Sequence, residues 1–215
     1  FEARKEPVYD AIDEPPAPVI ICGFGRVGQI VGRVLRMQGI AFTALDKSPE
    51  QVQVVRRFGS KVYFGNPARE ELLRAAGAES ARVLVVALDD MDETLQVVDL
   101  AKRHFPRLAI LARARNRRHA HLLMDRGVTG IVRETFLSSL RLTEMAMGEL
   151  GVAPDDAHRA IELFRVYDER NLVETHAIAH DETQMIQSTQ QASQELSELF
   201  EADRDQRRGA VSPSA

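Results

Sequence analysis

Short apolar runs alternate with amphipathic stretches along most of the chain. The apolar runs occupy 18–22, 41–45, 61–64, 83–87, 109–112 and 130–132. Several are continuously aliphatic, which is typical of strands whose two faces are both covered. The stretches between them place apolar residues three and four positions apart, as amphipathic helices do. The pattern predicts an α/β fold, a Rossmann-like doubly wound parallel sheet of about six strands.

The pattern changes after the last apolar run. Helical patterns then cover 134–150, 154–176 and 181–208, and the first stops at Gly151, a favourable residue just past a helix end. We therefore expect a Rossmann-type domain followed by helices that extend outside the sheet. The expected boundaries are a linker over 1–16, the Rossmann-type domain over 17–133, further helices over 134–180, and a peripheral amphipathic helix with a frayed tail over 181–215.

Charge and cysteine content narrow the classes of function. The formal net charge is −4, whereas nucleic-acid-binding surfaces are basic, so we expect no nucleic-acid partner. The single cysteine, Cys22, lies in an apolar run and is expected to be a small buried hydrophobe. The chain has no run of about 18 apolar residues, no signal-peptide pattern and no initial methionine. We interpret it as a soluble fragment of a longer protein.

A glycine motif, Gly23-Phe24-Gly25-Arg26-Val27-Gly28, directly follows the first predicted strand and opens a helix. In such a motif the first glycine permits a tight turn, the second lets the backbone approach a phosphate, and the third lets the helix pack closely. The second strand ends in Asp46, which is placed to accept hydrogen bonds from both ribose hydroxyls. A carboxylate would repel a 2′-phosphate, so the motif predicts a nucleotide with an unphosphorylated ribose.

Other residues follow the predicted strands at the same edge of the sheet, where ligands bind. Arg26, inside the motif, can clamp a phosphate or close the pocket over a mononucleotide. Asn66 is predicted to be a helix N-cap and Pro67 the first helical residue. Beyond the motif, the expected nucleotide contacts are Asp46, Lys47, Asn66, Pro67, Ala87 and Leu88.

The sequence contains no recognisable catalytic centre. His119 and His121 are two positions apart on a predicted helix, which places them on different faces and argues against a metal pair. No Ser/His/Asp arrangement, cysteine cluster or H-E-x-x-H motif is present. We therefore expect neither an enzyme nor a metal site. The densest basic cluster, formed by Arg113, Arg115, Arg117 and Arg118, fits either a solvated turn or a role facing an anion or a subunit.

Several stretches besides the run 20–33 carry a family resemblance. They are Arg57-Phe58-Gly59, Lys61-Val62-Tyr63-Phe64-Gly65, Ala75-Ala76-Gly77-Ala78, His104-Phe105-Pro106, Ala112-Arg113-Ala114-Arg115 and Arg133-Glu134-Thr135-Phe136. Together they resemble the potassium-transport nucleotide-binding (KTN) domain, also called the regulator of potassium conductance (RCK). The resemblance is strongest to the cytoplasmic part of the Kef glutathione-gated potassium-efflux systems. It covers about residues 17–170, and its R-E-T-F stretch is more specific than the glycine motif.

The resemblance implies a ligand-sensing regulatory domain at the cytoplasmic face of the bacterial inner membrane. The acidic N-terminal linker would join it to an antiporter-like membrane domain of the same protein. The family forms homodimers through helices equivalent to 134–180, and each domain holds AMP or NAD(H). Some members also engage an ancillary oxidoreductase subunit. Glutathione binds at the dimer interface and keeps efflux closed, and bulky glutathione adducts displace it. By position, the glutathione contacts fall on Arg33, Arg133, Asp168 and Gln29, and the aromatic residue that senses adduct bulk falls on Phe58.

Two positions depart from the usual family pattern. The family usually has Asp in the G-D-A stretch after the third strand, where this chain has Asn66-Pro67. One nucleotide contact is therefore expected to be weaker or altered. The usual asparagine contact to glutathione aligns with Asp168. An acid there would meet a ligand rich in carboxylates, so the ligand or its pose would differ.

Three other functions remain open from the sequence. A small NAD-dependent oxidoreductase would share the fold, but it needs a proton-transfer group near its substrate. The regulatory subunit of a Trk or Ktr potassium system would share the nucleotide site but not the interface arginines. A scaffold with a vestigial site would bind no nucleotide.

Overall fold

A computed structural model describes residues 9–179 and 181–210 of the chain. The chain divides into two compact units, Phe1–Glu134 and Thr135–Ala215. The first unit contains every strand found in the described part of the chain, and the second is built from helices.

The sheet of the first unit is parallel, with its six strands in the order β3-β2-β1-β4-β5-β6. The strands are β1 (Val19–Cys22), β2 (Phe42–Asp46), β3 (Tyr63–Phe64), β4 (Val83–Val86), β5 (Ala109–Ala114) and β6 (Gly130–Arg133). The chain winds outward in one direction from β1 and in the other from β4. The predicted doubly wound fold is confirmed, and its switch point lies between β1 and β4.

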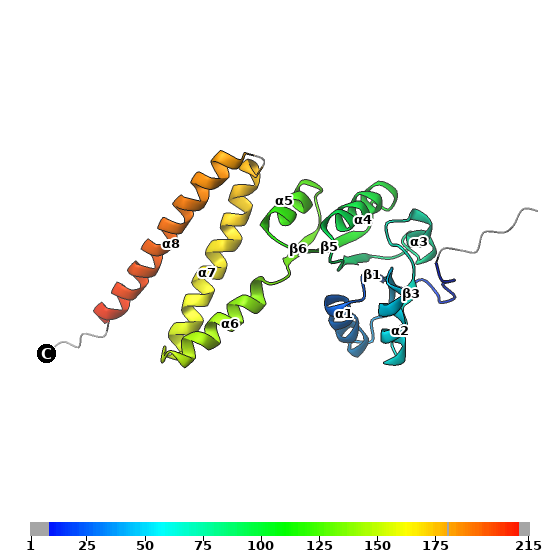
Figure 1. The fold of residues 1–215 in the computed structure, drawn as a ribbon, viewed down its shortest axis with the longest axis horizontal. Helices are drawn as coiled ribbons and strands as arrows, with labels where there is room; N and C mark the ends of the chain where they lie inside the picture. Colours follow the sequence, from blue (N-terminus) through cyan, green and yellow to red (C-terminus); the bar gives the residue numbers. More distant parts are fainter. Residues whose placement is uncertain (1–8, 180, 211–215) are drawn as a thin grey trace, which may run out of the picture. The chain divides into compact units, whose positions relative to one another are not determined.

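Helices cover the two sides of this sheet (Figure 1). On one side lie α1 (Arg26–Met37) and α2 (Pro49–Arg57), and on the other lie α3 (Glu70–Ala75), α4 (Met91–His104) and α5 (Arg117–Asp125). Three of these helices begin at a capping side chain that accepts a hydrogen bond from a backbone N–H in the first turn. The capping residues are Ser48 for α2, Asp90 for α4 and Asn116 for α5.

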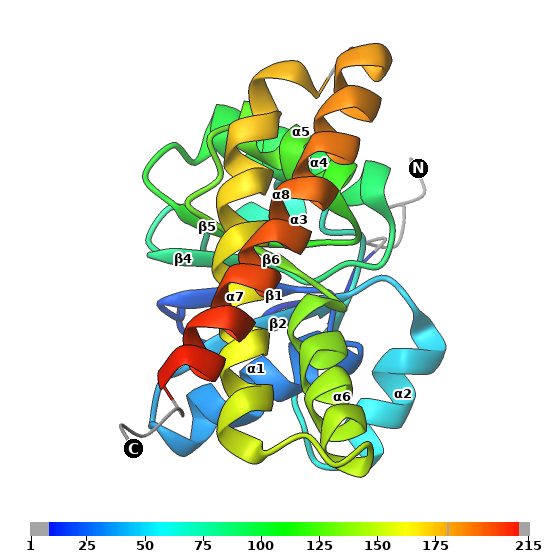
Figure 2. The same ribbon diagram turned by 90° about the vertical axis from the view of Figure 1, so that its left-hand side faces the viewer.

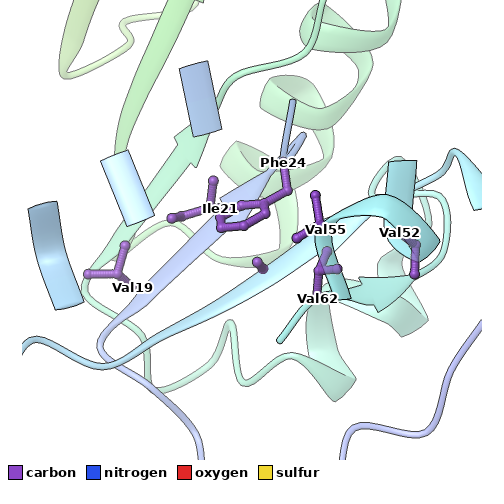
Figure 3. Packing of buried hydrophobic residues seen from close by; sticks show 7 residues of the cluster. Val19, Ile21, Phe24, Val52, Val55 and Val62 are labelled. Carbon is purple, nitrogen blue, oxygen red and sulfur yellow. The ribbon is translucent and has the colours of Figure 1, made fainter. Parts of the chain in front are cut away.

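The core on the α1–α2 side joins the first strands to both helices. Figure 3 shows the packing of Val19, Ile21, Phe24, Val52, Val55 and Val62. The Phe24 side chain is 1% exposed, and its ring stacks on Phe42 with the centroids 5.9 Å apart. Gly32 of α1 makes room for this pair, because a Cβ atom there would lie 2.8 Å from the Phe24 ring. The residue after the first motif glycine is thereby fixed in the core.

The β4–β6 half of the sheet has one side that the first unit itself leaves partly open. Val85 of β4 is half-buried, Leu111 of β5 is 41% exposed and Val132 of β6 is 61% exposed. We call these three residues the open face. For the runs of β4–β6, the expectation that both faces of the strands are covered is therefore not met within one chain.

The segment after β3 also differs from the prediction. Helix α3 begins at Glu70 with Arg69 at its N-cap, so the assignment of Asn66 as an N-cap and Pro67 as the first helical residue was wrong. Asn66 closes a turn instead. Its Oδ1 accepts a hydrogen bond from the Ala68 N–H at 2.9 Å, and its carbonyl accepts one from the Arg69 N–H at 3.1 Å. Asparagine is common at the first position of such turns, because its side chain can accept a hydrogen bond from the backbone N–H two residues further along the chain.

The described part of the expected linker is docked on the sheet unit. Residues 9–17, which we call the N-terminal strap, run beside β3 (Figure 1). Pro16 of the strap lies against Gly77, where an added Cβ would be 2.8 Å from the proline ring. The sequence did not reveal this docking, because polar, proline-containing segments are typical of linkers. The partners of Asp10 in the strap lie as far as 54 positions along the chain.

The second unit consists of helices that pack in sequence order (Figure 2). They are α6 (Phe136–Glu149), α7 (Pro154–Glu174), the short 3₁₀ helix η1 (Thr175–Ile178) and α8 (Glu182–Ala210). Gly151, just past α6, has a φ of 83° and confirms the predicted helix stop. The Tyr167 hydroxyl ties α7 to α8 by donating to the Ala192 carbonyl at 2.9 Å. In the described ranges, none of the helices is long and apolar enough to cross a membrane.

Candidate functional site

The parallel register brings the ends of the central strands to one level. Cys22 of β1 is aligned with Leu45 of β2 and with Val86 of β4. The Gly23 N–H donates to the Leu45 carbonyl at 2.9 Å, and the Ala87 N–H donates to the Cys22 carbonyl at 2.8 Å. Most residues predicted to contact a nucleotide therefore gather at the carboxyl edge beside the switch point. They are Gly23, Phe24, Gly25, Arg26, Asp46, Lys47, Ala87 and Leu88.

The three motif glycines have different surroundings. Gly23 has a φ of 89°, and a Cβ there would lie 2.9 Å from the Ala87 carbonyl oxygen. A Cβ on Gly28 would collide with the Gly23 carbonyl. Gly25 alone of the three faces open space, because a Cβ added there would have nothing within 4 Å. Two glycines therefore shape the turn, and the third leaves the backbone accessible.

Gly25 is the N-cap of α1, which has no capping side chain and no acidic residue in its first turn. The first N–H groups and the positive end of the helix dipole thus face the open space beside Gly25. Such a helix start favours an anion. Phe24 contributes only backbone here, because its ring lies in the core.

Asp46 fixes the glycine loop as well as marking the strand end. Its side chain is buried, Oδ2 accepts a hydrogen bond from the Phe24 N–H at 2.7 Å, and Oδ1 accepts one from the Ser48 N–H at 2.9 Å. Gln51 holds the same loop from α2, donating from Nε2 to the Phe24 carbonyl at 3.0 Å. A carboxylate oxygen can accept more than one hydrogen bond. Asp46 can therefore hold the loop and still accept from a ligand hydroxyl.

Four charged side chains form what we call the edge ion cluster: Arg26, Asp89, Arg113 and Glu134. Nη1 of the buried Arg113 lies 2.5 Å from Asp89 Oδ1, and its Nη2 pairs with Glu134. Nη2 of the exposed Arg26 lies 3.2 Å from Glu134 Oε1 and 4.0 Å from Asp89 Oδ1. Burial opposes the charged form of Arg113, but its hydrogen bonds to Glu134 and Asp89 outweigh this and raise its pKa. The cluster links the start of α1 to the ends of β4, β5 and β6.

Lys47 forms a second tie across the carboxyl edge. It follows β2 and pairs with Glu93 in the first turn of α4. Neither Glu93 nor Glu134 had a predicted role, and Arg113 was predicted only as one member of a basic cluster. The available signal for Arg113 was its place between two small residues inside an apolar strand pattern. Its partners are not visible in the sequence, because they lie on other strand ends.

A cavity of about 470 Å³ lies next to the edge ion cluster, between α1 and the open face. Val27 and Val31 of α1 line one side and Leu111 and Val132 line another, with Arg113 and Glu134 at its polar end. Only Val27 and Ala87 among the predicted nucleotide contacts border it. The cavity therefore adjoins the glycine loop without containing it.

The residues aligned with glutathione contacts lie on several elements. Gln29 and Arg33 are on α1, and Arg133 is the last residue of β6. Phe58 is the C-cap of α2 and is 84% exposed, at the end of that helix away from Asp46. Asp168 lies on α7 in the helical unit. Throughout the described ranges, no group of three or more His, Cys, Asp or Glu side chains is placed to hold a metal ion.

Comparison with known proteins identifies both parts of the chain. Residues 19–134 match the TrkA-N domain, and residues 138–214 match the potassium efflux system KefB C-terminal domain. The chain is similar to a solved structure described as Shewanella denitrificans Kef CTD in AMP bound form. The sequence identity is 45%, the TM-score is 0.69, and the match covers 74% of this chain and 98% of that chain.

Two further solved structures share the fold of the first unit. The TrkA-N domain of the inner membrane protein ybaL from Escherichia coli is 25% identical, with a TM-score of 0.56, over 62% of this chain and 98% of that chain. The GsuK channel bound to NAD is 19% identical, with a TM-score of 0.56, over 65% of this chain and 25% of that chain. The fold, both family matches and the Kef similarity agree, and the chain belongs to the RCK/KTN family as a Kef-type C-terminal regulatory domain.

Proposed function

We propose that the chain is the cytoplasmic sensory domain of a potassium-efflux system and binds an adenine nucleotide, AMP or NAD(H), at the carboxyl edge of the sheet. The observation that carries this proposal is the open space at Gly25, where α1 begins without an acid, next to the buried carboxylate of Asp46. The helix start would receive the phosphate and Asp46 the ribose. The AMP-bound form of the Kef homologue supports the assignment.

The edge ion cluster supports regulation rather than catalysis. Asp89 and Glu134 both pair with Arg113, so these carboxylates hold strand ends together instead of accepting or donating protons. The Arg26 side chain is 80% exposed and shares Glu134 with Arg113. A bound phosphate would compete with Glu134 for Arg26. Nucleotide binding would then change the ties between α1 and the end of β6.

Replacing Gly25 by alanine tests the nucleotide site. The added methyl meets nothing within 4 Å. Gly25 has a negative φ of −80°, but its ψ of −149° lies outside the usual extended region, so cooperative thermal unfolding must show that the variant remains folded. The methyl would occupy the space where a phosphate approaches the backbone. We expect the affinity for AMP, measured by isothermal titration calorimetry, to fall at least about tenfold.

Gly148→Ala is the matched control. Gly148 lies in α6, and an added methyl there also meets nothing within 4 Å. This variant should be more stable by about 0.5–1 kcal/mol, since alanine favours a helix interior, and should bind AMP like the wild type. Equal AMP affinity of Gly25→Ala and the wild type would remove the glycine loop from the site.

We further propose that the functional unit is a homodimer. The open face carries apolar side chains of the kind that a covered sheet buries, and α6 exposes Leu137, Leu142 and Met145 by 56%, 68% and 56%. Apolar surfaces of this kind are typical of subunit contacts. A second copy would supply the cover that the sequence pattern of β4–β6 predicts.

Glutathione or its adducts would bind at this dimer interface and gate efflux through the membrane transport domain of the same protein. The site would include Arg33, Arg133, Gln29, Phe58 and Asp168. Its support in the structure is the exposure of Arg33 on α1 and of Phe58 after α2. An arginine fork matches the carboxylates of glutathione. An ancillary oxidoreductase subunit remains a further proposed partner.

A further inference from the structure

Asp10 of the N-terminal strap pairs with β3 in the manner of a neighbouring strand. Its N–H donates to the Phe64 carbonyl at 2.9 Å, and its Oδ2 accepts from the Phe64 N–H at 2.7 Å. The same oxygen accepts from Arg56 Nη2 at 2.6 Å. Arg56 also donates to the Val62 carbonyl, at 2.8 Å from Nη2 and 3.1 Å from Nε. Asp10 and Arg56 together clamp the short strand at its outer edge.

A second set of contacts anchors the strap further along. Asp13 Oδ1 accepts from the Tyr63 hydroxyl at 3.1 Å and from Lys61 Nζ at 3.3 Å, and Lys61 pairs with Glu14 at 2.8 Å. The hydrogen bonds from Lys61 and Tyr63 lower the pKa of Asp13. Both residues of β3 are thus held by a strap carboxylate.

The other side of β3 faces the proposed nucleotide site. Phe64 is aligned with Asp46 in the parallel register, and the next residue, Gly65, donates its N–H to the Asp46 carbonyl at 2.9 Å. Asp46 in turn holds the Phe24 N–H of the glycine loop. Asp10, Phe64 and Asp46 therefore form a direct row from the strap to the glycine loop. Because β3 has only two residues, it has little pairing of its own to keep it in place when either side is lost.

We propose that docking of the N-terminal strap and occupation of the nucleotide site are thermodynamically linked, with Asp10 as the positioning residue. This inference rests on the proposed nucleotide binding. A nucleotide held by Asp46 stabilises β3 and the turn after it, and so favours the docked strap. By reciprocity, a docked strap raises nucleotide affinity by the same factor. The strap leads directly into β1. It therefore connects the nucleotide site, through the polypeptide chain, to any domain that precedes the strap.

The variant Asp10→Ala removes the acceptor for both the Phe64 N–H and Arg56. Asp99→Ala is its matched control, because Asp99 also pairs with an arginine at the surface, Arg126, but lies on α4 away from β3. We expect Asp10→Ala to bind AMP at least about fivefold more weakly than the wild type, the lower end of typical coupling between sites, and Asp99→Ala to bind like the wild type. Cooperative thermal unfolding of Asp10→Ala checks that it remains folded.

Hydrogen exchange of the wild-type chain supplies a second readout that needs no variant. AMP should slow exchange of the Asp10 amide, the strap N–H that donates to the Phe64 carbonyl, although Asp10 lies on the outer side of β3. If the strap only stabilises β3, amide exchange in the strap would be the same with and without AMP. Asp10→Ala would then lower the stability of the fold without lowering the affinity for AMP. Either result would overturn the linkage alone. Absence of saturable AMP binding by the wild type would instead overturn the proposed function, and the linkage with it.

Discussion

Asp46 holds two backbone N–H groups with one buried carboxylate, which gives it a structural role beside its proposed ligand role. In Asp46→Asn, only one atom of the side-chain amide, its oxygen, can accept a hydrogen bond. Either the Phe24 N–H or the Ser48 N–H would therefore face an NH₂ group. We expect the free energy of unfolding in urea to fall by about 1–3 kcal/mol, the cost of a buried donor left unsatisfied. AMP affinity should fall as well. The exposed Asp99→Asn should change stability by less than about 0.5 kcal/mol, and a similar loss in both variants would contradict this role of Asp46.

His119 predicts a stability difference that depends on pH. The Arg115 N–H donates to its Nδ1 at 3.1 Å, so Nε2 carries the hydrogen, and this buried atom has no partner among the described residues. Burial, with a smaller effect of Arg126, lowers the pKa of His119. The neutral ring is therefore favoured in the folded state.

As the pH falls below about 6.5, the unfolded chain takes up a proton at His119 and the folded chain does not. The stability due to the neutral ring is complete above that pH and is lost as the pH falls towards the folded-state pKa. His119→Gln keeps an acceptor for the Arg115 N–H but cannot titrate. We expect urea unfolding at pH 7 and pH 5 to show a larger loss of stability for the wild type than for His119→Gln. Equal losses would exclude His119 as the source.

At the scale of single residues, the sequence located the glycine loop but not the ion pairs around it. The glycines and Asp46 are recognisable because strand, turn and helix follow one another in a fixed spacing. Arg113 meets Asp89 and Glu134 only because β4, β5 and β6 end side by side, and such pairs depend on strand order. Lys47–Glu93 is hidden for the same reason.

At the scale of elements, α1 presents two arginines to two different places. Arg26 begins the helix and Arg33 follows two turns later, about 10 Å along the axis. Charge-preserving Arg33→Lys should weaken glutathione binding by about 1–2 kcal/mol, because lysine lacks the fork that matches a carboxylate. AMP affinity should stay unchanged.

Arg36→Lys is the control on the same helix, because Arg36 lies three residues beyond Arg33 and contacts the Phe42 ring. Calorimetry with glutathione at millimolar concentration makes the comparison. Lack of saturable glutathione binding by the wild type would reject glutathione as the ligand.

Elements were predictable where local pattern and packing agree. The continuous aliphatic runs identified the strands of the sheet, and Gly151 marked the end of α6. The start of α3 was misplaced, because Asn-Pro fits both a helix N-terminus and a turn. The sequence predicts a linker over 1–16, because the docking of the strap depends on residues of β3 and α2 that only the fold brings near.

At the scale of the whole molecule, the open face predicts that thermal stability depends on protein concentration. If a second copy covers it, the melting temperature should rise with protein concentration, as for any coupled association. Val132→Asp places a charge on this face and should raise the dimer dissociation constant at least about tenfold by analytical ultracentrifugation, the effect of burying an unpaired charge. Gln96→Asp adds the same charge at an exposed position of α4, which lies on the other side of the sheet. This variant should leave dimerisation unchanged. A monomeric wild type would contradict the proposal.

The N-terminal strap also has a consequence for solubility. β3 is the terminal strand of the sheet, and an edge strand with unpaired N–H and C=O groups is a template for another chain. Asp10 occupies both groups of Phe64, and the strap continues through Asp13, Glu14 and two prolines, which discourage further strand addition. Trimming the chain to begin at Ala17 would uncover this edge. Light scattering should then show aggregation at concentrations where the longer chain stays dispersed.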